Sequence, residues 1–575
     1  MVRHVANTEI ADKFERLADL LELQGDNPFR VHAYRNAARV IAGHPRALAD
    51  LVAEGADLDK LPGVGEAIAE KITSIVETGK LPALEKAARK TPLVLTDLMR
   101  VPGLGPKRVK QLHDALDVKG ANDIVRAAKN GKLAMLPGFG EKLAGKIASA
   151  IEQLAGEQQR FRLSEAENLA APLVEYLQGL DGVERVVIAG SLRRRKETVG
   201  DIDIVVTAKD GEAVLKQLTK FDGVRDVVSQ GDTRATVILS MNLQVDVRVV
   251  PEAAFGAAMY YFTGSRSHNI AVRRIAQDKG LKLNEYGLYR GNKRVAGKTE
   301  EAIFKALGMA WIPPELREAN GEIDAARKSR LPTLIAIEDL RGDLHSHTNA
   351  TDGHARLEDM AAAARKRGYA YLAITDHTRS TRVAHGLDPK RLRRELEKID
   401  RLNEGFKGFR LLKSAETDIL EDGSLDLPDS LLKELDFVLG ALHSHFNLSL
   451  KKQTKRVLKA FENPLLSGLA HPTARQIGER EPVNFDFEKI CEAAAERGIF
   501  LEVNGQPARL DLDDWHCRMA KEMGVMLAIS SDAHSTNDLD KIRFGVDQAR
   551  RGWVEAKDVI NTRPLREFMK LLRIA

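Results

Sequence analysis

The sequence has few of the features that mark secreted or membrane-bound proteins. Its 575 residues include only two cysteines, Cys491 and Cys517, too few for a disulfide framework, which favours a reducing cytoplasm. No apolar run is long enough to span a bilayer, and no stretch has the pattern of a signal peptide or of a low-complexity tract. The net charge of +5 is mild, and no tail is basic enough to sequester nucleic acid. A chain of this length predicts several domains rather than one.

Histidine is concentrated near the end of the chain. Ten of the fifteen histidines lie beyond residue 340. Histidines and carboxylates fall there in six fragments, which are Asp343-Leu-His345-Ser-His347, Thr375-Asp376-His377, Glu416, His443-Ser-His445, His471-Pro472 and Asp532-Ala-His534. One histidine is more often a satisfied core or surface residue than a ligand, but core histidines have no reason to recur at the ends of successive strands. Imidazole with carboxylate, and no thiolate, suits catalytic zinc or manganese.

The spacing of these fragments predicts their fold. Short apolar runs at 369–374, 437–442, 467–470 and 526–530 precede four of them, and helix-like charged stretches such as 357–367 and 487–497 lie between. The order of strand, ligand and helix is typical of a β/α barrel, which presents side chains at the C-terminal rim of its parallel strands.

This region resembles the polymerase and histidinol phosphatase (PHP) domain, a metal-dependent phosphoesterase barrel. The resemblance implies up to three ions, Mn²⁺ or Zn²⁺, with Glu416 bridging two of them. The implied ligands are His345, His347, Asp352, His377, Glu416, His443, His471, Asp532 and His534. Asp352 stands where some relatives carry histidine, and His354, His445 and Asn504 are expected beside the ligands or at the surface. Such a cluster suits hydrolysis of a phosphodiester.

A second catalytic pattern lies in the middle of the chain. A predicted strand, 186–189, runs into Gly190, Ser191 and two arginines, the second of which is Arg194. Asp201 and Asp203 share one face of the next strand, because residues two apart in a strand point the same way. A third strand, 243–249, places Asp246 on a face opposite its valines. Three converging carboxylates need cations between them, here Mg²⁺ or Mn²⁺, although an isolated Asp-x-Asp is more often a solvated polar face.

The joint pattern resembles the nucleotidyltransferase palm of family X DNA polymerases, the polymerase beta family. The resemblance implies that Gly190, Ser191 and Arg194 hold the nucleotide phosphates. It implies a nucleotide pocket made of Tyr261, Phe262, Gly264, Asn269 and Arg273. Arg266 and His268 depart from that family's pattern, and the alternative for the two aromatic residues is plain core packing.

The N-terminal region repeats a third motif. Pro-Gly-x-Gly frames carry Gly63 and Gly65, Gly103 and Gly105, and Gly138 and Gly140, each ahead of a helix-like segment. They resemble helix-hairpin-helix units, whose backbone N–H groups grip DNA phosphates without reading sequence.

The first of these units also resembles the lyase region of polymerase beta relatives. That resemblance implies a Schiff-base role for Lys71 and a phosphate pocket at Arg30 and Tyr34, but Ala67 replaces a lysine of the pocket. The alternative is that Lys71 is one more cation on the DNA backbone.

The expected architecture is multidomain. It comprises a lyase-like helical domain (1–88), further helix-hairpin-helix modules (89–158), an α+β palm (159–252), a nucleotide-binding subdomain (253–315), a linker (316–338) and the C-terminal metal-binding barrel (339–575). The whole order resembles bacterial and archaeal family X polymerases with a C-terminal PHP domain. That implies a cytoplasmic monomer that fills short gaps during base excision repair, using dNTPs on gapped or primer-template DNA, and carries a 3′-5′ exonuclease.

Lyase action by Lys71 and cleavage at abasic sites by the barrel stay open. A small-molecule phosphatase would leave the palm and hairpins unexplained, and a non-catalytic DNA-binding scaffold would leave both metal sets unexplained.

Overall fold

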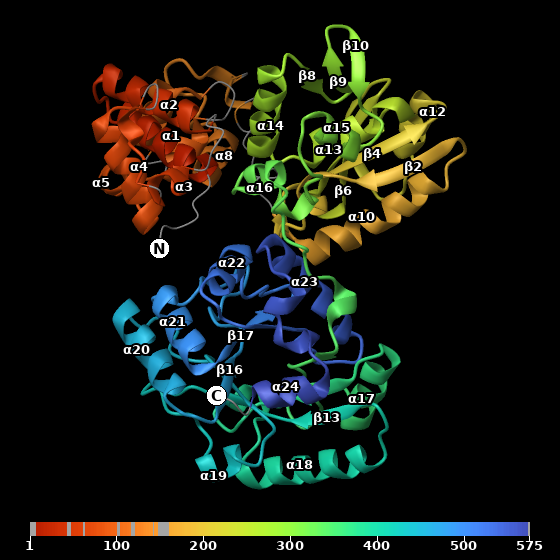
Figure 1. Cartoon of the computed structure of the whole chain (residues 1–575). Coiled ribbons are helices and arrows are strands. Elements are labelled where there is room, and N and C mark those ends of the chain that lie inside the picture. Colours follow the sequence, from red (N-terminus) through yellow and green to blue (C-terminus); the bar gives the residue numbers. More distant parts are fainter. Residues whose placement is uncertain are drawn as a thin grey trace. The chain divides into compact units, whose positions relative to one another are not determined.

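The computed structural model divides the chain into two compact units, Met1–Leu331 and Pro332–Ala575 (Figure 1). It describes residues 7–42, 48–53, 55–60, 64–99, 104–116, 121–141, 143–145, 147 and 160–572. Gly63 and Gly103 lie outside these ranges, so their predicted contacts with DNA have no structural description. Among the described helices, none is long and apolar enough to cross a bilayer.

Helices form the described part of the N-terminal region. They are α1 (Asn7–Leu23), α2 (Pro28–Ala42), α3 (Leu48–Ala53), η1 (Leu58–Lys60), α4 (Glu66–Thr78), α5 (Pro82–Ala88), α6 (Val94–Leu98), α7 (Pro106–Leu116) and α8 (Ala121–Lys129). Ile10, Phe14, Leu17 and Leu21 recur three or four residues apart along α1, and all four are buried. This apolar face forms one core with the helices around it.

The described residues after each of the three glycine frames are helical, as predicted. Gly65 precedes α4, and its carbonyl accepts hydrogen bonds from the amides of Ile68 (2.8 Å) and Ala69 (2.9 Å). Gly105 has the same relationship to the start of α7. Gly138 lies in a turn and Gly140 is the first helical residue after it; both have positive φ, +83° and +47°, which glycine adopts without strain.

A five-stranded sheet in the order β2-β4-β7-β6-β5 forms the palm. Its strands are β2 (Val183–Ile188), β4 (Asp201–Ala208), β5 (Val224–Gln230), β6 (Arg234–Leu239) and β7 (Gln244–Val249). Strands β4 and β7 are parallel, and the other pairs are antiparallel. The helix α10 (Leu163–Gln178) leads into the sheet, and short strands β1 (Phe161–Arg162) and β3 (Thr198–Val199) pair beside it. The alternation predicted for β4 and β7 holds, because Ile202, Ile204, Val245 and Val247 are buried in the core.

The palm also contains the helices α11 (Gly190–Arg193) and α12 (Gly211–Leu218). Helices and a small sheet follow it; they are α13 (Phe255–Thr263), α14 (Arg266–Asp278), β8 (Lys282–Asn284), β9 (Gly287–Arg290), β10 (Lys293–Ala296) and α15 (Glu300–Ala306). The order β10-β9-β8 is antiparallel throughout.

The first half of the expected linker is folded rather than extended. Residues 316–338 are expected to connect the domains. However, η4 (Pro314–Leu316) ends at the first residue of this range, and α16 (Glu322–Arg327) lies within it. Arg317 and Glu322 are fully buried. Glu322 Oε1 lies 2.7 Å from Nδ1 of the buried His268, which ties α16 to α14. The boundary between the two units falls at Leu331 and Pro332, and the residues after it pack on the C-terminal unit, where Ile335 is buried and its amide donates to the carbonyl of Val554 (3.0 Å). The finer division of the chain into domains stays a prediction.

The C-terminal unit alternates strands and helices. Its strands are β11 (Gly342–Asp343), β12 (Tyr371–Ile374), β13 (Arg410–Lys413), β14 (Glu416–Asp418), β15 (Val438–Ala441), β16 (Leu466–Leu469), β17 (Phe500–Asn504) and β18 (Leu527–Ser530). Its main helices are α17 (Leu357–Lys366), α18 (Pro389–Glu404), α19 (Asp429–Leu432), α20 (Leu450–Phe461), α21 (Phe487–Arg497), α22 (Asp514–Glu522), α23 (Ile542–Arg551) and α24 (Leu565–Leu571). The apolar runs and charged stretches of the sequence therefore form the strands and helices expected of them.

The strands form two parallel sheets, β11-β12-β13 and β14-β15-β16-β17-β18, rather than one continuous barrel ladder. Isolated parallel bridges link the two sheets: His377, beyond the end of β12, pairs with Glu416 of β14, and Ser346, beyond the end of β11, pairs with Ala533, beyond the end of β18. Parallel β/α architecture is confirmed, whereas an uninterrupted barrel is not. The breaks occur where ligand side chains leave the strands.

Candidate metal and nucleotide sites

The three palm carboxylates converge as their strands predict. Asp203 on β4 is paired directly with Asp246 on β7, and Asp201 lies two residues earlier on the same face. Asp246 accepts hydrogen bonds from Thr236 Oγ1 (2.6 Å), Gln244 Nε2 (2.9 Å) and Arg234 Nη2 (3.1 Å). Burial, and then the charges of Asp201 and Asp246, raise the pKa of Asp203 to about 7. A divalent cation between the carboxylates would remove this repulsion, so the donors fit the expected metal.

The glycine turn lies against these carboxylates. Gly190 has φ +62°, and a Cβ atom there would be 2.4 Å from Asp203 Oδ2. Only glycine therefore lets the turn from β2 to α11 approach the metal-binding face so closely. Ser191 follows in α11, where a phosphate could meet its hydroxyl.

Both arginines of this turn already have partners. Arg194, predicted to bind nucleotide phosphates, donates from Nε to Glu318 Oε1 (3.1 Å) and from Nη1 to the carbonyl of Thr263. Arg193 pairs with Glu300, whose carboxylate also holds the buried Arg317. Glu318 therefore pairs with Arg194, the cation that the sequence predicts to bind the triphosphate.

The residues predicted to form a nucleotide pocket lie in α13, in α14 and in the turn between them. Asn269 Nδ2 donates to the carbonyl of Tyr261 (2.7 Å), and the Arg273 guanidinium lies 4.7 Å from the centroid of the Tyr261 ring. Phe262 is covered in the same way by Arg248, at 4.4 Å. Gly264 ends α13 with φ +68°. The sequence did not single out Arg248, although it placed this residue on the same strand face as Asp246.

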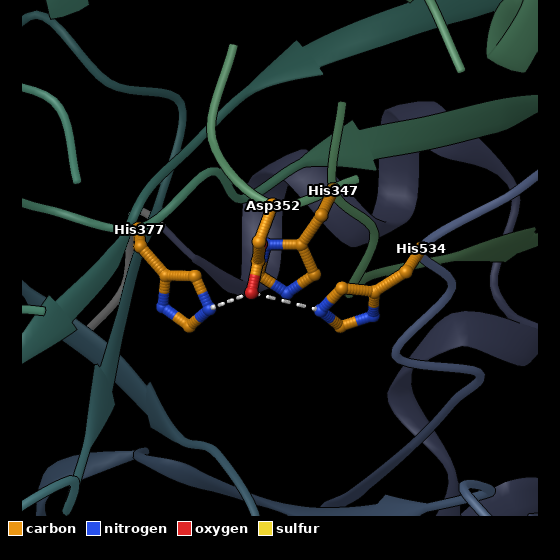
Figure 2. A group of neighbouring side chains, drawn as sticks. All are labelled: His347, Asp352, His377 and His534. Atoms are coloured by element: carbon orange, nitrogen blue, oxygen red, sulfur yellow. Dashed lines mark ion pairs between the residues drawn. The ribbon is translucent and has the colours of Figure 1, made fainter. Parts of the chain in front are cut away.

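All nine predicted ligands of the C-terminal unit meet in one cluster. Three overlapping groups have donor atoms close enough to share a cation. They are His347, Asp352, His377 and His534; His345, His347 and Asp532; and His377, Glu416 and His443. Figure 2 shows the first group, in which the rings of His377 and His534 flank the Asp352 carboxylate, each at 3.4 Å.

Glu416 lies at the centre of this cluster. Its Oε1 is 2.7 Å from His471 Nε2 and 3.1 Å from His443 Nε2, which brings His471 into the set. Its Oε2 faces His377 Nδ1 at 2.9 Å and His345 Nε2 at 3.5 Å. The two oxygens thus face different histidines, as a bridging carboxylate must.

The donor set fits metal ions. His345 Nε2 and His347 Nε2 lie 3.1 Å apart, and within the described chain the buried His347 Nδ1 and His471 Nδ1 find no hydrogen-bond partner. Burial alone would lower the pKa of His377, but Glu416 and Asp352 raise it to about 10. Burial and the neighbouring His534 and His377 lower the pKa of His347 to about 3. Such mutual dependence of pKa values is typical of side chains that bind shared metal ions.

Sequence reasoning missed the carboxylates behind the ligands. Glu502 Oε1 lies 2.7 Å from His345 Nδ1, and its Oε2 accepts from the amide of His471 (2.6 Å). Asp418 Oδ1 lies 3.0 Å from His443 Nδ1. Each carboxylate fixes which imidazole nitrogen faces the cluster. Glu502 interrupts the apolar run of β17 as its third residue, and a carboxylate inside a buried strand was an available signal.

Of the three residues expected beside the ligands or at the surface, one lies beside a ligand and two lie at the surface. Asn504 is buried and donates from Nδ2 to Asp532 Oδ2 (3.1 Å), whereas the side chains of His354 and His445 are exposed. In the N-terminal region, Lys71 Nζ donates to the carbonyl of Ala67 (2.7 Å), and the Arg30 guanidinium lies 5.9 Å from the Tyr34 ring centroid.

Family models match most of the chain. Helix-hairpin-helix models match residues 5–81, 55–117 and 95–153; the DNA polymerase beta palm matches 160–276; its thumb matches 258–318; and the PHP domain matches 343–505. The match to PHP ends before Asp532 and His534, which the structure nevertheless brings to the cluster.

Similar proteins cover either the whole chain or one of its halves. A DNA polymerase/3′-5′ exonuclease PolX of Bacillus subtilis (strain 168) is 37% identical over 98% of this chain and 99% of its own length. A probable phosphatase of Thermoanaerobacter sp. (strain X514) is 31% identical over 40% of this chain and 94% of its own length. DNA polymerase lambda of Rattus norvegicus is 28% identical over 54% of this chain and 56% of its own length.

Proposed function

The chain belongs to the PolX family of family X DNA polymerases with a C-terminal PHP domain, and we propose that it both extends and trims DNA 3′ ends during gap repair. The carrying observation is that each compact unit holds its own converging set of metal donors. One set is built on the β4–β7 pair, and the other surrounds Glu416.

In the palm, we assign Asp201, Asp203 and Asp246 to two Mg²⁺ or Mn²⁺ ions. Bound cations of this kind neutralise phosphate charge and activate the attacking oxygen. Gly190, Ser191 and Arg194 would hold the phosphates of a dNTP. Tyr261, Phe262, Gly264, Asn269 and Arg273 would line the rest of the nucleotide pocket. This assignment is supported by the shared face of the carboxylates and by the close approach of Gly190.

In the C-terminal unit, we assign the nine clustered residues to up to three Mn²⁺ or Zn²⁺ ions and to removal of nucleotides from 3′ ends. The mixture of imidazole and carboxylate donors supports this choice of ions. The substrate would be gapped or primer-template DNA, gripped by the glycine frames through its backbone. We further propose a monomer in the cytoplasm, where the buried thiols of Cys491 and Cys517 stay reduced.

The test is a primer with a 5′-phosphorylated one-nucleotide gap, incubated with and without dNTPs in Mg²⁺ or Mn²⁺. Asp246→Ala should lose extension and keep digestion, whereas Glu416→Ala should lose digestion and keep extension. Loss of digestion in Asp246→Ala with retention in Glu416→Ala would refute this assignment.

A small-molecule phosphatase activity is the second candidate for the C-terminal unit. The similarity to a probable phosphatase over 94% of that protein's length favours it. Hydrolysis of sugar or amino-alcohol phosphate monoesters at a rate well above DNA digestion would decide for this alternative.

A further inference from the structure

A loop begins directly after the ligand His377 and covers residues 378–387. We call it the rim loop; it contains the short helix η6 (Arg382–Ala384). A parallel bridge, Thr378↔Leu387, closes its base, and the amide of Leu387 donates to the carbonyl of His377 (2.7 Å). Both ends of the rim loop are therefore fixed at one ligand of the cluster.

The underside of the rim loop is fixed to a second ligand. Thr381 Oγ1 lies 3.3 Å from His443 Nδ1 and donates to Asp418, the carboxylate that orients this imidazole. The amide of Ser380 donates to Asp426 Oδ2 (3.0 Å). On the other side, Arg391 Nη1 donates to the carbonyl of His385 (2.8 Å). These contacts hold the loop at the edge of the cluster in one conformation.

The tip of the rim loop carries positive charge and one exposed apolar side chain. Arg379, Arg382, Val383 and His385 are exposed, and the loop contains no acidic residue. Within the described chain, no ion pair involves Arg379 or Arg382. Val383 is 93% exposed, the highest value among the large hydrophobic side chains described. Burial of such a side chain by a ligand is favourable because its apolar surface leaves water.

One exposed apolar side chain is ordinary and alone indicates nothing. Here Val383 directly follows Arg382 and lies four residues after Arg379, two arginines without an acidic partner in the described chain, on a loop fixed to two ligands of a phosphodiester-cleaving site. Unpaired DNA offers both matching groups, since its phosphates attract the arginines and its base faces are free to pack against apolar side chains. Duplex DNA hides those faces in its stack.

We propose that the rim loop is the strand-binding element of the C-terminal site and selects an unpaired 3′ end. Arg379 and Arg382 pair with backbone phosphates next to the bond that is cut, and Val383 packs against a base near the 3′ end. This inference rests on the proposed exonuclease function of the same site.

Disulfide trapping tests the position of the strand without any turnover. Cys491 and Cys517 are the only cysteines and both are buried, so Val383→Cys introduces one exposed thiol. The matched control is Arg410→Cys, exposed at the start of β13 and thus at the opposite ends of the parallel strands. With EDTA present, Val383→Cys should capture single-stranded DNA bearing a thiol tether on its 3′-terminal base at least tenfold more than DNA tethered at its 5′ end. Equal capture of both ends, or equal capture by Arg410→Cys, would overturn the proposal.

Kinetics of the full-length chain test the arginines. The double variant Arg379→Gln/Arg382→Gln should lower kcat/KM for single-stranded DNA at least tenfold, and its logarithmic dependence on salt should flatten by about 1.4, roughly 0.7 for each phosphate contact. Arg410→Gln should change neither value. Hydrolysis of bis(4-nitrophenyl) phosphate should stay unchanged, since this diester is too small to reach the tip.

A loss shared by DNA and the small diester would show that the loop only maintains the site, and no loss with either would also refute the proposal. If the unaltered protein cleaves the small diester and not DNA, the exonuclease assignment fails instead, and trapping still decides where a strand lies.

Discussion

Glu502 Oε1 lies 2.7 Å from Nδ1 of His345, and neither side chain is exposed by more than 1%. The carboxylate fixes the ring so that its other nitrogen, Nε2, points at Glu416 (3.5 Å) and Asp532 (3.6 Å). The second carboxylate oxygen of Glu502 accepts a hydrogen bond from the backbone amide of His471. One buried carboxylate thus positions two ligands from different strands without being a predicted ligand itself.

Replacing Glu502 should weaken metal binding while the ligands remain. In Glu502→Gln the side chain keeps its shape but loses the charge that favours the orientation of His345, and loss of such an outer partner typically costs roughly 10- to 100-fold in metal affinity or activity. Titration of exonuclease activity with Mn²⁺ should show this shift, and Glu492→Gln, exposed on α21, is the control. An unchanged Mn²⁺ dependence would mean that Glu502 does not support the ligands.

Glu318 should oppose nucleotide binding in the palm. Its carboxylate pairs with Arg194 and lies 4.0 Å from Lys196, so a triphosphate that uses Arg194 must displace it. Glu318→Gln should therefore lower the KM for dNTPs several-fold with little change in kcat, because one competing charge is removed. The exposed Glu301→Gln is the control in single-turnover gap filling. A higher KM in Glu318→Gln would mean that Glu318 positions Arg194 for the nucleotide.

Glu300 should make the palm and thumb sensitive to acid. Burial alone would raise the pKa of Glu300, but Arg317 and Arg193 lower it from 4.5 to about 2. A carboxylate with a lowered folded-state pKa stabilises the fold above its unfolded pKa, and this stabilisation is lost as pH falls from about 4.5 to about 2. Its full value is about 3 kcal/mol, from roughly 1.4 kcal/mol per pKa unit.

Glu300→Gln should accordingly be less stable at neutral pH and lose less stability on acidification. Trp311 Nε1 lies 3.5 Å from Glu300 Oε2, so its fluorescence reports this region in a Trp515→Phe/Trp553→Phe background. Urea unfolding at pH 7 and at pH 3 gives the two free energies, with Glu301→Gln as the control. A loss that is as large at pH 3 as at pH 7 would exclude the charge as its cause.

The sequence predicted the strands because strand formation depends on local pattern. Alternation placed Asp201 and Asp203 on one face of their strand and Asp246 on the polar face of another, and the structure pairs Asp203 directly with Asp246 across β4 and β7. Glu502 and Asp418 were missed because their function depends on which imidazole nitrogen they meet across the sheet, and spacing along the chain does not carry that information.

The expected linker shows a different limit. Pro313, Pro314 and the Asn320-Gly321 pair favour turns, and these turns exist, since Gly321 has φ +97° ahead of α16. However, a buried ion pair between Arg317 and Glu300 and a buried hydrogen bond between His268 and Glu322 hold the segment on the preceding subdomain. Charged residues in a predicted linker look solvated until their partners, here Glu300 and His268, are brought close by the fold.

Lys71 is predicted to trap an incised abasic site. Its amine donates a hydrogen bond to the carbonyl of Ala67. Both residues lie in α4, the helix that follows the Gly65 turn. Borohydride should yield a covalent DNA adduct with the unaltered chain and none with Lys71→Ala. The control variant Lys80→Ala, which replaces an exposed lysine, should still form the adduct. An adduct that persists in Lys71→Ala would assign the chemistry to another amine.

Gly190→Ala should disable the palm and leave the C-terminal unit intact. Its φ of +62° disfavours any side chain by roughly 1–2 kcal/mol, and its new Cβ would lie 2.4 Å from Asp203 Oδ2, so the carboxylate must shift from its position beside Asp246. Gly182→Ala is a matched control, because Gly182 has φ +78° in the same domain but its Cβ would meet nothing closer than 3.9 Å. We expect Gly190→Ala to reduce nucleotide incorporation at least 100-fold, Gly182→Ala to keep most of it, and both to digest single-stranded DNA normally. Similar incorporation by the two variants would show that backbone strain, rather than contact with Asp203, makes glycine necessary at this turn.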